Sequence, residues 1–342
     1  MAVEATTTSM AGSGRSPLER PLRARFPDRL LRWVLTALAA GILLLIAFFF
    51  VRLIVEANPA LSKFGVLHFA FDNDWDVSRS IYGALPLVVG TLITSAIALL
   101  IGVPIAVATA VYLTELAPRR VRGPLTVLVE LLAAVPSVVY GLWGVFVLIP
   151  KLKPAEAWFG RTFDFIPFVG ADVAGPNYFI AGLILAIMIL PIVSAISREV
   201  LATVPVGDKE AALALGATRW EMIRIAVLPY SRAGITGAAM LGLGRAIGET
   251  IAVTLVIGNA PQIGGTIFEQ GYTLAAVIAN EFGEAANNPL HRAALIAAGL
   301  VLFVLTLLVN VLARAFVVRG QRKRAGGPAQ GQAAIAAGGP PV

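Results

Sequence analysis

The stretch from Ser80 to Thr114 contains 35 consecutive residues without a charged side chain. About 20 largely apolar residues are enough for a helix to cross a bilayer. The whole chain is similar in character, since 58% of its residues are hydrophobic, only 14% are charged and the mean hydropathy is +0.82. Soluble proteins carry about 25% charged residues. We therefore expect an all-α polytopic membrane protein whose solvent is mostly lipid.

Six apolar runs of this kind predict six transmembrane helices. They lie within Trp33–Val51, Ser80–Thr114, Gly123–Pro150, Val173–Ser197, Ala233–Phe268 and Ala293–Ala313. The first run is longer than the apolar core of a signal sequence, which has about 7–15 residues, so we interpret it as a retained anchor. The six helices form one transmembrane domain over residues 31–320. Residues 1–30, which are basic, and residues 321–342 are expected to be disordered tails.

The positions of the cations predict the orientation. The N-terminal tail, the segments Thr114–Gly123 and Arg198–Arg232, and the end of the chain together hold nineteen Lys and Arg residues, whereas the alternate loops hold seven. By the positive-inside rule both termini lie in the cytoplasm. The net charge of +7 is thus a topology signal, and nucleic acid is not expected as a partner.

Several chemistries are disfavoured by the residues present. The chain has no Cys and only two His, His68 and His291, so no metal centre and no cofactor is expected. The loop with Asp72, Asp74 and Asp76 lacks the glycine and distal glutamate of a calcium loop and is interpreted as a solvated, partner-facing loop. No phosphate-binding G-x-x-x-x-G-K-[ST] motif occurs. The chain is therefore not expected to be an enzyme, and any ATP hydrolysis must come from another subunit.

The cytosolic segment Arg198–Arg232 is longer than a simple turn. Val206-Gly207-Asp208 is typical of a helix start, Lys209–Leu215 favours a helix, and Gly216 would end it. Ala217-Thr218 can then cap a second helix that begins near Arg219. Two short helices at an angle would form a compact knob for a partner to hold. An interfacial amphipathic helix that only fixes the topology is the alternative.

The same segment resembles the EAA loop of bacterial ABC importer permeases. Glu210-Ala211-Ala212, three residues, Gly216, nine residues and Ala226-Val227-Leu228-Pro229 follow the family pattern, except that Ala226 stands where the family usually has Ile. The resemblance implies a coupling helix that docks into a groove of the ATPase subunit, with roles for Glu210, Ala211, Ala212 and Gly216.

Within this family, the stretch Gly242–Asn259 is most similar to the permeases of phosphate importers, and the similarity extends over Ile81–Val318. It implies an assembly in the bacterial inner membrane. The partners would be a PstA-like sister permease that completes a heterodimer, two PstB-like ATPase subunits at the coupling helix, and a PstS-like extracytoplasmic phosphate-binding protein.

Three ionisable residues, Glu130, Arg245 and Glu249, fall within the predicted spans. A charge that faces lipid costs at least about 2.5–3.5 kcal/mol, so each should face the bundle or a water-filled path. Arg245 and Glu249 are four residues apart, which predicts one helix face and a possible ion pair. Arg245 could meet the charge of an oxyanion, while Glu249 could accept a hydrogen bond from the O–H of hydrogen phosphate.

This chemistry would favour protonated phosphate over sulfate, and the resemblance independently places the polar pair in the translocation pathway. Thr250 follows the pair and joins the candidate path, as does Glu130, which could instead have a structural role near the cytosolic end. A purely structural Arg245–Glu249 ion pair remains an alternative. Gly244 and Gly248 have the spacing of a close helix approach, which predicts packing against a partner helix.

The sequence thus favours the membrane permease of an ATP-driven importer for inorganic phosphate. The same architecture for another oxyanion, molybdate or sulfate, is the first alternative. A secondary carrier or channel is the second, although the halves show no convincing repeat. A membrane-embedded enzyme is the least favoured, because no nucleophile–base set is found.

Overall fold

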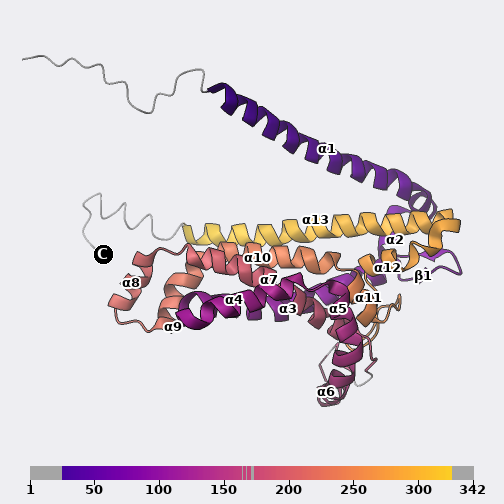
Figure 1. Cartoon of the computed structure of the whole chain (residues 1–342). Helices are drawn as coiled ribbons and strands as arrows, with labels where there is room; N and C mark the ends of the chain where they lie inside the picture. Colours follow the sequence, from indigo (N-terminus) through magenta and orange to yellow (C-terminus); the bar gives the residue numbers. More distant parts are fainter. Residues whose placement is uncertain (1–24, 164, 167, 171–172, 326–342) are drawn as a thin grey trace, which may run out of the picture. The chain divides into compact units, whose positions relative to one another are not determined.

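The computed structural model describes residues 25–163, 165–166, 168–170 and 173–325 and is mostly helical (Figure 1). Within these ranges five helices are long and apolar enough to cross a membrane, or six if one bent pair forms a single span. The five are Leu30–Phe64, Leu85–Leu116, Ser137–Thr162, Tyr178–Ala202 and Pro289–Ala315, and the bent pair is Arg219–Gly248 with Ile251–Ile257. The predicted all-α membrane fold is confirmed, with its six spans reached only if the bent pair counts as one.

The chain divides into two compact units, one up to Arg52 and one from Leu53 onward. The first unit holds most of helix α1 (Arg25–Phe64), whose apolar side chains from Leu30 to Val51 are exposed within this chain except for the half-buried Phe50. A helix that is apolar on all sides is suited to lipid or to a helical partner, which fits the predicted anchor.

In the second unit α3 (Leu85–Val111), α7 (Tyr178–Ala202), α10 (Leu228–Gly248) and α13 (Pro289–Ala325) run alongside one another (Figure 1). Small residues let α3 and α7 approach closely. A Cβ atom on Gly182 would lie 2.5 Å from Ile97, and one on Gly102 would lie 3.0 Å from Ile189. These glycines bring the two backbones together and fix the centre of the bundle.

The third predicted span, Gly123–Pro150, is wrong as a continuous helix. Helix α4 (Arg119–Ala134) ends at Val135, whose backbone is extended, and α5 (Ser137–Trp143) begins after Pro136. Proline disfavours the helical conformation of the residue before it, so the break falls at this position. The chain then continues through η3 (Gly144–Leu148) into α6 (Ile149–Thr162).

The fifth predicted span, Ala233–Phe268, is also broken. Helix α10 ends at Gly248, and α11 (Ile251–Ile257) follows at a bend of 65°. Gly258, with φ of +97°, ends α11, and the chain up to Thr273 is not helical. This segment is held over the start of α7, where the Tyr178 N–H donates to Glu269 O at 3.1 Å.

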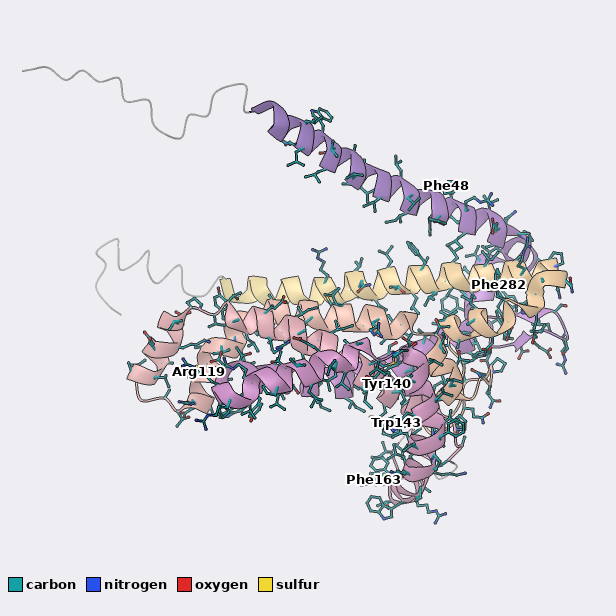
Figure 2. The ribbon with its side chains drawn as sticks, in the orientation of Figure 1. Phe48, Arg119, Tyr140, Trp143, Phe163 and Phe282 are labelled. Atoms are coloured by element: carbon teal, nitrogen blue, oxygen red, sulfur yellow. The ribbon has the colours of Figure 1, made fainter. Side chains whose placement is uncertain are left out.

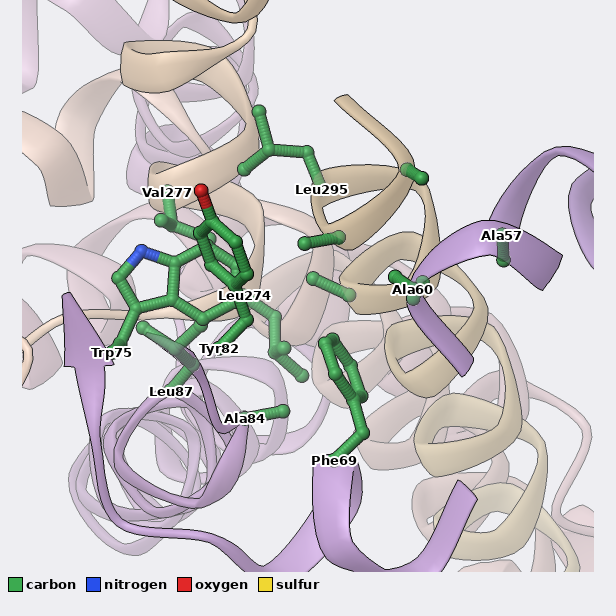
Figure 3. Close-up of a cluster of buried hydrophobic side chains, with 14 of the residues drawn as sticks. Ala57, Ala60, Phe69, Trp75, Tyr82, Ala84, Leu87, Leu274, Val277 and Leu295 are labelled. Carbon is green, nitrogen blue, oxygen red and sulfur yellow. The ribbon is translucent and has the colours of Figure 1, made fainter. Parts of the chain in front are cut away.

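A second core lies at the end of the bundle opposite α8 (Val206–Ala214) (Figures 1 and 3). It joins α2 (Val66–Phe71), the antiparallel strands β1 (Trp75–Asp76) and β2 (Ile81–Tyr82), α12 (Leu274–Glu281), η5 (Glu284–Asn287) and the start of α13. The Trp75 indole donates to Glu281 Oε2 at 3.1 Å, and the same oxygen lies 2.9 Å from His291 Nε2. The Tyr82 ring stacks on His291 at 5.5 Å.

The hairpin turn uses one aspartate of the predicted solvated loop. Asp76 Oδ1 accepts hydrogen bonds from the Ser78 and Arg79 backbone N–H groups at 2.9 and 3.1 Å, and from the Ser78 hydroxyl at 2.5 Å. The hydroxyl bond, followed by the backbone bonds, lowers the pKa of Asp76. Asp76 therefore has a local structural function in the turn.

The helices extend a few residues into both of the predicted tails. Helix α1 begins at Arg25 and α13 extends to Ala325, so residues 25–30 and 321–325 are helical rather than disordered. The remaining parts of the two predicted tails, residues 1–24 and 326–342, lie outside the described residues.

Candidate substrate path and coupling surface

The knob between Arg198 and Arg232 begins as the sequence predicts. Helix α8 (Val206–Ala214) ends before Gly216, which has φ of +87°, and Thr218 starts α9 (Arg219–Met222) through a capping box with Glu221. The predicted glycine stop and cap are confirmed. The second helix is not short, however, because α9 continues through η4 (Ile223–Val227) into α10.

The knob is fixed to the bundle by a small core and an ion pair. Ala212 is buried among residues of α7, α9 and η4 such as Leu201, Met222 and Val227. Lys209 Nζ lies 2.6 Å from Glu115 Oε1 in η2 (Tyr112–Leu116), and both side chains are mostly buried. These contacts join α8 to the end of the second span.

The opposite side of the knob faces outward. Glu210, Ala211 and Gly216 are exposed, and two large apolar side chains beside them, Leu215 and Trp220, are 90% and 62% exposed. Exposed apolar side chains at a helix–turn–helix corner form a surface that a protein partner can cover. Of the four residues assigned to coupling, only Ala212 faces inward.

Arg245 lies in the last turn of α10. It is exposed and forms no ion pair with any residue in the described ranges. The guanidinium of Arg245 interacts electrostatically with the hydroxyl of Tyr140 in α5. This hydroxyl donates a hydrogen bond to Leu132 O at 2.8 Å, across the break between α4 and α5. A cation here also complements the negative end of the α10 dipole.

Glu249 lies beyond the helix end rather than on the helix. Its backbone is extended, and its Oε1 accepts a long hydrogen bond of 3.4 Å from the Ala252 N–H, at the start of α11. The Thr250 hydroxyl donates to Gly248 O at 3.3 Å. Glu249 and Thr250 are both half-buried. The break between α10 and α11 thus holds two side chains with oxygen atoms, shortly after Arg245 in the sequence.

The predicted common face of Arg245 and Glu249 stays a prediction. Helix α10 ends at Gly248, so Glu249 is the residue that caps its C-terminus, and no ion pair joins the two side chains in the described part of the chain. The sequence is apolar both before Arg245 and after Glu249. Hydropathy alone therefore could not show that the helix breaks here.

The glycines of α10 divide between two faces. A Cβ atom on Gly242 would lie 2.7 Å from Val193 of α7, so this glycine serves packing within the chain. At Gly237, Gly244 and Gly248 a Cβ atom would meet no other described atom within 4 Å. The Gly244-x-x-x-Gly248 spacing thus lies on an open face, and its packing against another subunit stays a prediction.

Glu130 is engaged in an ion pair at the end of the bundle that carries the knob. Its Oε1 lies 2.8 Å from Arg198 Nη2 of α7, and Arg198 also donates to Thr126 at 2.9 Å. A structural role for Glu130 was one of the two predicted possibilities, but the sequence did not identify Arg198 as its partner. The Lys209–Glu115 ion pair and Tyr140 were missed altogether, since no local spacing connects residues from different helices.

These features define a polytopic membrane protein with a broken helix and a helical knob whose corner exposes apolar side chains. The family model of the binding-protein-dependent transport system inner membrane component matches residues 102–320. The chain belongs to this family, and it is accordingly an inner-membrane transport permease.

Curated relatives are similar over most of the chain. The phosphate transport system permease protein PstC of Xylella fastidiosa strain 9a5c is 40% identical over 93% of this chain and 99% of its own length. The PstC of Mesorhizobium japonicum is 45% identical over 83% of this chain and 88% of its own length. PstC 2 of Mycobacterium bovis is 44% identical over 85% and 92%, respectively.

The fold has solved counterparts. A bacterial ABC transporter involved in the import of the acidic polysaccharide alginate gives a TM-score of 0.57 at 17% identity, covering 86% of this chain and 99% of that chain. The same type of transporter in complex with an alginate-bound periplasmic protein gives 0.56 at 20% identity, covering 86% and 98%. At this identity the likeness concerns the fold alone.

Proposed function

We propose that this chain is the transmembrane permease subunit of an ATP-driven importer that carries inorganic phosphate into the cytoplasm. The observation that carries the proposal is the break at Glu249–Thr250, which follows the exposed Arg245, a cation without an ion pair among the described residues. The names of the relatives, phosphate transport permeases at 40–45% identity, support the same substrate.

Two groups of opposite character can recognise hydrogen phosphate. The planar guanidinium of Arg245 offers a fixed charge and paired donors for oxyanion oxygens. Glu249 uses Oε1 at the start of α11, and its Oε2 can accept a hydrogen bond from a phosphate O–H. Thr250 adds a hydroxyl at the same break. Sulfate has no proton to donate at neutral pH, so the carboxylate would repel it.

Glu130 is the weakest member of the proposed path, because its carboxylate is already satisfied by Arg198. We assign it to the cytosolic end of the path, where it fixes α4 on α7. Its contribution would be to position those helices rather than to contact the transported ion.

Energy would enter through the knob. The exposed surface of Glu210, Ala211, Gly216 and Leu215 is suited to a groove on a PstB-like ATPase subunit, and Ala212 with Lys209 would transmit the motion to the bundle. A PstA-like sister permease would cover the open face of α10, and a PstS-like phosphate-binding protein would deliver substrate at the opposite end. ATP hydrolysis thus belongs to a partner.

The test is uptake of labelled phosphate into proteoliposomes that contain the whole complex and the binding protein, with ATP inside or outside. The proposal requires phosphate uptake that depends on ATP on the cytosolic side. Uptake of molybdate or sulfate in preference to phosphate would identify another oxyanion importer. Phosphate uptake without ATP would establish a secondary carrier or channel and overturn the importer class.

A further inference from the structure

Helix α6 leaves the bundle at the end opposite the α8–α9 knob. Figures 1 and 2 show α5 and α6 turned away from the direction of α3, α7 and α10, with Phe163 at the end farthest from the bundle. Most of the surface of α6 is therefore uncovered by its own chain. The second half of the Ser137–Thr162 helix is also its polar half, since it carries Lys151, Lys153 and Arg161.

The inner face of α6 is fixed by a buried polar contact. Glu156 is 4% exposed, and its Oε2 accepts a hydrogen bond from Asn177 Nδ2 at 3.3 Å. Asn177 also caps α7 by accepting from the Ile180 N–H at 2.8 Å, and its own N–H donates to Val256 O of α11 at 3.0 Å. This network joins α6 to the start of α7 and to the end of α11.

Aromatic rings strengthen the same attachment. Phe159 of α6 lies 6.3 Å from Phe268, measured between ring centroids, and Phe268 lies 5.7 Å from Phe179 of α7. Phe268 is 2% exposed and belongs to the non-helical segment that follows α11. The side of α6 that faces the protein is thus defined, and so is the side that faces away.

The outward side combines aromatic rings with cations. Trp158 of α6 is 63% exposed, and Phe165 and Phe168 after the helix are 80% and 71% exposed. The three cations Lys151, Lys153 and Arg161 are exposed and form no ion pair with a described residue. The acidic residue of α6 is the buried Glu156, so the exposed charges of α6 itself are all positive; the turn after α6 also contains Asp164, which lies outside the described residues.

This composition selects one kind of occupant. Large rings are costly to leave in water, and the cores of protein interfaces are depleted in lysine. A helix with tryptophan and phenylalanine beside lysine and arginine is typical of the membrane–water boundary, where the rings enter the acyl region and the cations meet anionic headgroups.

We propose that α6 and the turn after it form a lateral anchor in the headgroup region of the outer leaflet that binds anionic phospholipid. Trp158, Phe165 and Phe168 enter the acyl boundary, while Lys151, Lys153 and Arg161 contact headgroup phosphates. Because Asn177 connects α6 to α11, the lipid steadies the helix that follows the break in the substrate path. The proposal rests on the membrane location of the chain and on the predicted orientation with the α8–α9 knob in the cytoplasm, and it is independent of the transported ion.

The absence of Cys from the chain permits a direct test. Phe165→Cys and Phe168→Cys are labelled with a nitroxide in the whole complex, with Cys-free partners, in vesicles of phosphatidylethanolamine and phosphatidylglycerol. We expect collisions with oxygen to exceed collisions with a water-soluble nickel chelate severalfold. Asn287→Cys, at an exposed position of η5, is the control and should show the reverse order.

Two results would overturn the anchor. Frequent collisions with the nickel chelate would place the turn in water, and infrequent collisions with both reagents would place it against another subunit. Since label accessibility requires no transport, failure of the anchor is distinguishable from failure of the proposed function.

The role of the cations is tested by replacing phosphatidylglycerol with neutral phosphatidylcholine. We expect the oxygen-to-nickel collision ratio of the label at residue 165 to fall severalfold in the parent chain and in Arg292→Gln, which removes an exposed cation outside α6. The combined variant Lys151→Gln, Lys153→Gln and Arg161→Gln should give the same low ratio in both lipids. An equal lipid response in parent and combined variant would contradict anionic-lipid binding.

Discussion

Arg245 lies in the last turn of α10, and Glu249 lies just after Gly248, the last residue of that helix. The two side chains thus leave the backbone on either side of the point where α10 bends by 65° into α11. A cation and a carboxylate arranged in this way need not neutralise each other. They can instead contact two different atoms of a third group, which is the arrangement that an anion with an O–H group requires.

The first prediction concerns Arg245. Arg245→Gln should lower phosphate uptake by about tenfold or more, since a hydrogen bond to a charged group contributes about 1.5–3 kcal/mol, while ATP hydrolysis by the assembled complex continues. Arg245→Lys keeps the charge but loses the planar donor pair and should be intermediate. Arg232→Gln, at the cytosolic end of α10, is the matched control. Normal uptake in Arg245→Gln would assign the residue to helix stabilisation alone.

A second prediction separates the two functions of Glu249. Glu249→Gln keeps an oxygen that can accept from the Ala252 N–H, so the start of α11 should be preserved. The loss of negative charge should make sulfate a stronger competitor of phosphate uptake. Glu249→Ala should in addition destabilise the local structure by about 0.5–2 kcal/mol, as for other lost helix caps. Unchanged competition by sulfate in Glu249→Gln would exclude the carboxylate from anion selection.

Gly216 provides a test of the knob. Its φ of +87° is unfavourable for any residue with a side chain, and Gly216→Val should cost about 1–2 kcal/mol locally. We expect weaker binding of the ATPase subunit in a pull-down of the complex and less phosphate carried per ATP. Gly207→Ala is the control, since Gly207 lies within α8 with open space around its Cα. Equal ATPase binding in both variants would show that the turn geometry is dispensable.

The Lys209–Glu115 ion pair should matter for stability. Removal of one partner of a buried ion pair costs about 3–5 kcal/mol because the other charge is left uncompensated, and Glu115 is 8% exposed in its side chain. Lys209→Met should therefore lower the thermal unfolding temperature of the complex markedly. The exposed neighbour Asp208→Asn should not. The double variant Lys209→Met with Glu115→Leu should recover part of the loss, and no recovery would argue against a direct interaction.

Glu130 is expected to tolerate substitution. Its side chain is 56% exposed, and exposed ion pairs contribute about 0–1 kcal/mol. Glu130→Gln should retain a hydrogen bond to Arg198 and change phosphate uptake little, in contrast to Arg245→Gln measured in the same vesicles. A loss of uptake as large as that of Arg245→Gln would return Glu130 to direct contact with the transported ion.

Local chemistry made part of the molecule predictable. The apolar runs required membrane helices because uncharged segments of this length have no other suitable solvent. Gly216 and Thr218 predicted the corner of the knob. A glycine that ends a helix and a threonine that caps one both act on the backbone of residues close to them in the sequence. The resemblance of the Glu210–Pro229 segment to the EAA loop added the partner, which no physical property of the segment would have specified.

The breaks and the contacts across helices were decided by the tertiary structure. A run such as Ala233–Phe268 is equally apolar whether it is one helix or two, and only packing against α7 and α5 selects the bend after Gly248. Contacts such as Glu130–Arg198, Lys209–Glu115 and Glu156–Asn177 join residues 68, 94 and 21 positions apart. Sequence determines local conformation through neighbouring backbone groups, but which distant charges meet depends on how the helices pack.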